Sequence, residues 1–189
     1  MANFTVVYDA CVFYPATLRD LLIRLAVTRR FRARWTTQIH EEWTKSLLAN
    51  RNDLTRQQLD RIVTLANNAV EDCLITGYEH IIEGLKLPDP NDRHVLAAAI
   101  RVGAATIVTM NLKDFPSEIL SEFEIFALHP DDFILDLADL EPPILERVAK
   151  EQRASLRNPP VSAIEFVASI RRQGLPGVAN FLEERVDLI

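Results

Sequence analysis

The segment LPDPNDRHVLAAAIRVGAATIVTMNLKDF (Leu87–Phe115) decides the fold class of this chain. Asp89 is placed to cap a helix, Pro90 suits the first helical position, and Gly103 is placed to end the helix. The run Thr106–Thr109 that follows is short, apolar and β-branched, which indicates a buried strand. A helix followed at once by such a strand predicts an α/β fold with parallel strands.

Apolar periodicity extends this alternation in both directions. Further strands are predicted at residues 4–8, 31–35, 73–76 and 124–128. Further helices are predicted at about residues 15–30, 36–47 and 55–70. We therefore expect a three-layer α/β fold, in which helices flank a mostly parallel central sheet on both faces.

The pattern changes after the run His129–Asp132, which is typical of a domain boundary. Three helices are predicted beyond it, at residues 142–156, 162–174 and 176–186, without a strand. We expect an α/β domain over residues 1–132 and an all-helical C-terminal extension over residues 133–189. An extension of this size is small to stand alone, so it should pack on the first domain or on another chain.

Composition favours a soluble globular protein, since 48% of the residues are hydrophobic and 25% are charged. No apolar run is long enough to cross a membrane, and the first residues lack the basic start of a signal peptide. Cys11 and Cys73 are too few for a disulfide framework. We expect a cytoplasmic protein without membrane association.

Charge is unevenly distributed within the net charge of −6. Residues 19–61 carry ten Lys and Arg against five Asp and Glu, whereas residues 71–146 carry four against sixteen. A basic segment beside an acidic one suits an anionic substrate held near a cation in an acidic pocket. Solvated helix faces explain the same counts equally well.

Acidic residues fall where strands are expected to end, and ligand crevices of parallel sheets lie at those ends. Asp9 follows the first strand, Asn111 and Asp114 follow the strand at 106–109, and Asp92 lies in the first turn of the preceding helix. Each alone could be an ordinary turn or helix-start residue. Together the carboxylates would repel one another, and Mg²⁺ or Mn²⁺ would relieve that repulsion through oxygen ligands.

A further acid should come from the helix at 36–47, where Glu41 and Glu42 compete. If Ile39, Trp43 and Leu47 form the buried stripe, Glu42 lies roughly 100° from its centre and Glu41 roughly 160° away. This favours Glu42 modestly.

At these residues the chain resembles the PIN domain and, within that family, the VapC-type toxins of bacterial toxin–antitoxin pairs. The resemblance rests on Asp9 after an apolar strand, Glu42 early in the second helix, the run Asp92–Ala99 and the run Val108–Phe115. It covers roughly residues 3–130. The helical C-terminal segment lies outside the minimal family domain and resembles an extension that some longer members carry.

The resemblance implies an endoribonuclease that depends on Mg²⁺ or Mn²⁺, is often homodimeric, and is inhibited by a cognate antitoxin protein. Its catalytic and metal-binding acids carry over as Asp9, Glu42, Asp92 and Asp114. This chain has Asn111 where many members have Asp, so the fourth ligand stays open between Asn111, Asp114 and both. Thr109 is expected to add a hydroxyl contact.

Four arginines, Arg29, Arg30, Arg32 and Arg34, form the densest basic cluster of the chain and, together with Lys113, are candidate contacts for the RNA substrate. The arginine cluster could equally bind an acidic antitoxin or solvate an edge strand. Two other functions suit the same scaffold: a structure-specific DNA nuclease, and a PIN-like module that only binds proteins.

Other reactive side chains have simpler explanations. The run His40–Thr44 begins like a zinc-protease helix, but Thr44 stands where the second zinc ligand would be. Cys11 is expected to be a small buried hydrophobe rather than a nucleophile. The remaining histidines lack ligand spacing and are expected at the surface or at helix caps; they are His80, His94 and His129.

Overall fold

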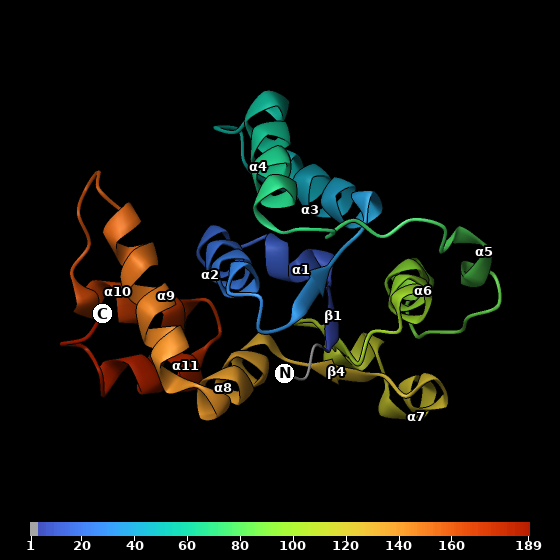
Figure 1. Cartoon of the computed structure of the whole chain (residues 1–189). Helices are drawn as coiled ribbons and strands as arrows, with labels where there is room; N and C mark the ends of the chain where they lie inside the picture. The colour runs from blue at the N-terminus through green and yellow to red at the C-terminus, as the bar shows by residue number, and fades with distance from the viewer. Residues whose placement is uncertain (1–3) are drawn as a thin grey trace.

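A computed structural model describes residues 4–189 of the chain. Its centre is a four-stranded sheet with the strand order β2-β1-β3-β4, and every neighbouring pair is parallel. Figure 1 shows β1 and β4 of this sheet among the surrounding helices. The strands are β1 (Thr5–Tyr8), β2 (Arg32–Arg34), β3 (Thr106–Val108) and β4 (Phe126–Leu128). This confirms the predicted parallel sheet.

Helices flank this sheet, as the alternation of patterns predicted. The longer ones in the first two thirds of the chain are α2 (Ala16–Val27), α3 (Thr37–Asn50), α4 (Arg56–Ala69) and α6 (Arg93–Val102). Short helical segments join them: α1 (Ala10–Phe13), α5 (Glu79–Ile82), α7 (Ser117–Leu120), and the 3-10 turns η1 (Pro90–Asp92), η2 (Leu112–Asp114) and η3 (Ser121–Phe123).

Helix ends follow the expected capping chemistry. The side chain of Asp89 accepts a hydrogen bond from the backbone N–H of Asn91 over 2.8 Å at the start of η1. Gly103 ends α6 in the left-handed conformation, with φ of 59°, which a residue without a Cβ adopts readily. Capping boxes at Thr55 and Ser162 start two further helices.

One short helical turn was not predicted, and one predicted strand is absent from the described residues. Residues 10–13 form one helical turn, because the side chain of Asp9 accepts from the N–H of Ala10 and caps it. Residues 73–76 do not form a strand; Leu74 makes an isolated bridge with Trp35 beside β2.

Four helices form the C-terminal region: α8 (Pro130–Leu140), α9 (Pro142–Ser155), α10 (Ala163–Arg172) and α11 (Pro176–Glu183). The last three were predicted, whereas α8 was not. The run His129–Asp132, which was expected to mark a domain boundary, is the start of α8, where His129 accepts from the N–H of Asp131 and Pro130 occupies the first helical position. Residue 132, the predicted last residue of the first domain, lies in the first turn of this helix.

The aromatic core joins this region to the sheet. Phe133 of α8 is buried and packs edge-on against Tyr8 of β1 and against Phe31, with ring centroids 6.4 Å and 5.1 Å apart. Tyr8 in turn stacks on Trp35 at 6.1 Å. Helix α8 therefore contributes to the same core as the strands.

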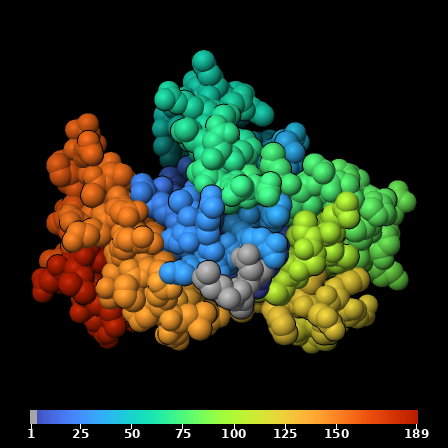
Figure 2. Space-filling view, viewed as in Figure 1, coloured from blue at the N-terminus to red at the C-terminus, as the bar shows by residue number. Residues whose placement is uncertain are grey.

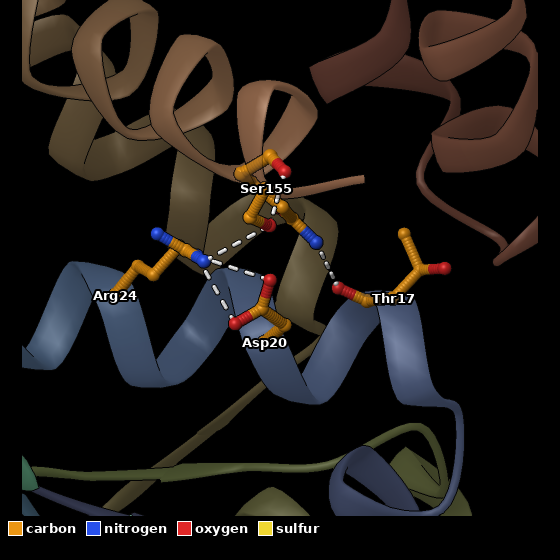
Figure 3. Close-up of polar contacts among 5 residues, drawn as sticks. Thr17, Asp20, Arg24 and Ser155 are labelled. Atoms are coloured by element: carbon orange, nitrogen blue, oxygen red, sulfur yellow. Dashed lines mark hydrogen bonds and ion pairs between the residues drawn. The ribbon is translucent and has the colours of Figure 1, made fainter. Parts of the chain in front are cut away.

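Polar contacts hold α9 on α2 (Figure 3). The buried amide of Gln152 donates to the carbonyl of Thr17 over 2.9 Å, and Arg24 donates to the hydroxyl of Ser155 over 3.2 Å. Arg24 also pairs with Asp20 at 3.0 Å within α2. Figure 2 shows the orange and red C-terminal segments together at one side of the molecule, beside the blue segments of the N-terminal part. No helix within residues 4–189 is long and apolar enough to cross a membrane.

Candidate active site

A cavity of about 530 Å³ opens at the carboxyl ends of β1 and β3. Its polar lining includes Asp9 after β1, Glu42 of α3, Asp92 at the end of η1, and Asn111 after β3. The structure thus brings together four of the side chains that the sequence singled out, from four separate parts of the chain.

Asp9 is buried at the floor of this cavity and held by hydrogen bonds to both carboxylate oxygens. Oδ1 accepts from the backbone N–H of Ala10 over 2.6 Å. Oδ2 accepts from the hydroxyl of Thr109 over 2.8 Å and from the thiol of Cys11 over 3.0 Å. These donors restrict rotation of the carboxylate.

Cys11 acts in this arrangement as a hydrogen-bonding residue. Its sulfur accepts from the backbone N–H of Met110 over 3.1 Å while its thiol faces Asp9. Burial, followed by the nearby charge of Asp9, raises the pKa of the Cys11 thiol far above its ordinary value, so the thiol stays protonated. The expectation that Cys11 is not a nucleophile agrees with this environment, but its role is polar rather than merely space-filling.

Asp92 carries the clearest electrostatic signature in the cavity. Its pKa is raised from 3.8 to about 7, first by burial and then by the charges of Asp9, Asp89, Asp114 and Glu42. When several negative charges raise the pKa of a carboxyl group, the acids that carry them share one region of negative potential. Perturbation of this kind is typical of functional sites.

Glu42, rather than Glu41, faces the cavity. Glu41 is exposed on the outer side of α3, whereas Oε1 of Glu42 lies 2.7 Å from Nε2 of His94. The helical periodicity therefore selected the glutamate that the structure places in the cavity.

The choice between Asn111 and Asp114 is one of distance from the cavity. Asn111 lines it, and its backbone N–H donates to the hydroxyl of Thr109 over 3.0 Å. Asp114 lies in η2 outside the lining, although its charge contributes to the raised pKa of Asp92. Asn111 is thus the candidate metal ligand nearer to the cavity, and Asp114 lies outside the cavity lining.

The basic cluster lies away from this cavity. Arg32 pairs in register with Thr5, at the amino end of the sheet, whereas Asp9 follows the carboxyl end of the same strand β1. The neighbouring arginines make contacts of their own: Arg29 with Glu71 at 3.0 Å, Arg30 with Glu141 at 2.8 Å, and Arg34 with the carbonyl of Asp72. Lys113 is exposed in η2, next to Asp114. The structure does not bring the four arginines to the acidic site.

His94 is the site residue that sequence reasoning misplaced. It was expected at the surface or at a helix cap, but its side chain is only 2% exposed and contacts Glu42. The apolar pattern of α6 puts His94 on the buried side next to Val95 and Leu96, and this signal was present in the sequence. His80 is exposed and His129 caps α8, as expected.

The donor set suits a hard divalent cation. Every charged side chain in the described lining is a carboxylate, and no Lys or Arg is among the lining residues of the described chain. Among residues 4–189, no group of three or more His, Cys, Asp or Glu side chains is clustered tightly enough to enclose an ion. Carboxylate and amide oxygens are the ligand type that Mg²⁺ takes, usually with several water molecules and only one or two carboxylates bound directly.

Comparison with known proteins agrees with this fold. Residues 5–113 match the PIN domain family, and residues 130–184 match the family described as the VapC50 C-terminal domain. The chain belongs to the PIN domain family. It is similar to the protein named "Putative ribonuclease VapC50" of Mycobacterium tuberculosis (strain ATCC 25618 / H37Rv), with 48% identity over 77 residues. That alignment covers 41% of this chain and 45% of the relative, so the chain matches less than half of the relative's length.

Proposed function

We propose that this protein is an endoribonuclease that hydrolyses RNA phosphodiester bonds with the help of Mg²⁺ or Mn²⁺. The observation that carries the proposal is the convergence of Asp9, Glu42 and Asp92 on one cavity without a lining Lys or Arg in the described chain. The name of the relative from M. tuberculosis supports RNA as the substrate.

In this mechanism Asp9 and Asp92 would hold the metal, with Asn111 as a neutral oxygen donor and Asp114 adding negative charge nearby. A bound divalent cation supplies Lewis-acid chemistry, lowering the pKa of water and stabilising negative charge on the phosphoryl group. Asp9 is held in place by its three donors. Glu42 would orient the attacking water or accept its proton, since its carboxylate reaches the same cavity.

We further propose that the protein is the toxin of a toxin–antitoxin pair, bound by a cognate antitoxin and acting in the cytoplasm, as the resemblance to VapC-type toxins implies. The match of residues 130–184 to the VapC50 C-terminal domain supports this assignment. Co-expression with the product of the adjacent gene tests it directly. A stable complex with suppressed RNA cleavage is expected, and unaffected cleavage in the presence of every neighbouring product would oppose the toxin role. The masses of the free protein and of the complex in solution test the expected homodimer.

The nuclease itself is tested with purified variants. Asp9→Asn and Asp92→Asn should each lower the rate of Mn²⁺-dependent RNA cleavage by about 100-fold or more, because each removes a charged ligand. The matched control is Asp132→Asn, which changes an exposed acid of α8 and should cleave like the wild type. Undiminished cleavage by both site variants would refute the assignment.

Two parallel measurements separate the other functions. Flap and duplex DNA assayed beside RNA would reveal a structure-specific DNA nuclease by faster cleavage of DNA. Calorimetric titration with Mn²⁺ would reveal a module that only binds proteins, because such a module should bind no ion at the acidic cavity.

A further inference from the structure

His94 differs from the other buried histidine of the protein. In His40, Nε2 lies 2.9 Å from Oδ1 of Asn67 and Nδ1 accepts from the indole N–H of Trp43 over 2.9 Å. His40 is thus a satisfied core residue. Among residues 4–189, neither ring nitrogen of His94 makes a hydrogen bond of regular geometry, and its close polar contact is the 2.7 Å approach of Nε2 to Glu42.

Burying an imidazole in this way costs free energy, because its polar atoms lose water without full replacement. An apolar side chain would fill the same space in α6 at lower cost. The position of the unsatisfied ring is informative, since it lies against a carboxylate of the proposed active site. Unsatisfied buried groups of this kind call for a functional explanation.

The contact joins two of the elements that build the cavity. His94 lies two residues after Asp92, at the start of α6, and Glu42 belongs to α3. The histidine side chain is 2% exposed, whereas the Glu42 side chain is 37% exposed. One oxygen of Glu42 therefore lies against the buried ring of His94, while the Glu42 side chain also lines the solvent-accessible cavity.

We propose that His94 is a positioning residue that holds Glu42 in its working orientation, a role that rests on the proposed nuclease function. The contact is attractive when Nε2 carries a hydrogen and points it at Oε1. Without the His94 side chain, Glu42 would sample other rotamers, and its carboxylate would no longer be oriented toward the attacking water.

A double-mutant cycle tests whether His94 acts through Glu42. His94→Leu should lower kcat for RNA cleavage by about 10-fold with little change in KM, a loss typical of residues that orient a site group. In the Glu42→Gln background the same substitution should change kcat less than about twofold. His94→Gln, which retains an N–H donor, should recover much of the activity. Independent, multiplicative effects of the two substitutions would overturn the proposal.

A second readout does not depend on catalysis. In the metal-free protein, Glu42→Gln should shift the ¹⁵N resonance of His94 Nε2, whereas the matched control Glu41→Gln should leave it unchanged. An unchanged resonance in Glu42→Gln would overturn the proposed contact whether or not the protein cleaves RNA. If Glu42→Gln shifts the resonance but the wild-type protein cleaves no RNA, the nuclease function is refuted and the contact is retained. If His94→Leu fails to show cooperative urea unfolding, the double-mutant cycle is measured with His94→Gln and His94→Asn in its place.

Discussion

Thr109 donates its hydroxyl hydrogen to Oδ2 of Asp9 over 2.8 Å and so joins the residue after β3 to the residue after β1. The same oxygen accepts from the Cys11 thiol, and the Thr109 hydroxyl accepts from the N–H of Asn111. One chain of hydrogen bonds therefore connects two candidate metal ligands through the ends of adjacent strands. The sheet sets the orientation of these ligands as well as their proximity.

Thr109→Val should weaken Mn²⁺ binding by about 10-fold, because side chains that donate hydrogen bonds to metal ligands commonly contribute 10- to 100-fold in affinity. Valine keeps the shape and the strand preference of threonine but leaves Oδ2 of Asp9 with fewer donors. Calorimetric titration measures the change. Thr106→Val makes the same replacement in β3, away from the cavity, and should bind Mn²⁺ like the wild type. Equal affinities for all three proteins would contradict the role of the hydroxyl.

Mn²⁺ affinity should depend on pH through Asp92. The pKa of this carboxyl is about 7 in the metal-free protein, so below pH 7 a proton must leave before the carboxylate can bind a cation. The dissociation constant should rise by up to about tenfold for each unit of pH below 7 and level off above it. Titrations between pH 5.5 and 8.5 measure this, and a flat profile would be inconsistent with Asp92 as a ligand.

Asp92→Asn should stabilise the metal-free fold at alkaline pH. The folded-state pKa lies above the ordinary 3.8, so ionised Asp92 destabilises the fold above pH 7, and this penalty declines as pH falls toward 4. In EDTA at pH 8 the variant should melt about 2–4 °C higher than the wild type, a modest shift because solvent screens the half-exposed carboxyl. The two melting temperatures should converge near pH 4. A variant that melts lower at pH 8 would show that Asp92 supports the fold instead.

Asp131 should matter for stability and not for metal binding. Its buried carboxylate accepts from the N–H groups of Gly177 and Val178, both over 2.8 Å, at the start of α11. Asp131→Ala should lower the free energy of unfolding by about 1–2 kcal/mol, the usual cost of losing a helix cap. The neighbouring exposed Asp132 provides the control, since Asp132→Ala should stay within about 0.5 kcal/mol of the wild type in urea unfolding. Similar losses for both variants would contradict the cap.

The residues that begin and end helices made much of the fold predictable. Asp89 and Gly103 bracket the helical region that delivers Asp92, and the apolar run after Gly103 is β3. The stripe on α3 also separated Glu42 from Glu41. These features depend on neighbours within a few residues, so a single sequence carries them.

Other features depended on information that local sequence lacks. Pro130 and the acids after it suit a linker and a helix start equally, and only the burial of Phe133 in the aromatic core shows that α8 continues the fold. The sequence left the arginine cluster open as a contact for RNA, for an antitoxin or for solvent alone, and it did not show that strand register puts Arg32 beside Thr5, at the end of the sheet opposite Asp9. Register is decided by tertiary packing, which periodicity does not specify.

The burial of Phe133 against Tyr8 and Phe31 also bears on how the protein can be divided. A fragment that ends before α8 would present these two aromatic rings, together with the face of α2 that α9 covers, to water. Exposed apolar surface of this kind favours self-association. If such a shortened fragment is recovered poorly or is inactive, the cause is aggregation of its truncated core. The result would not show that RNA cleavage requires the last helices.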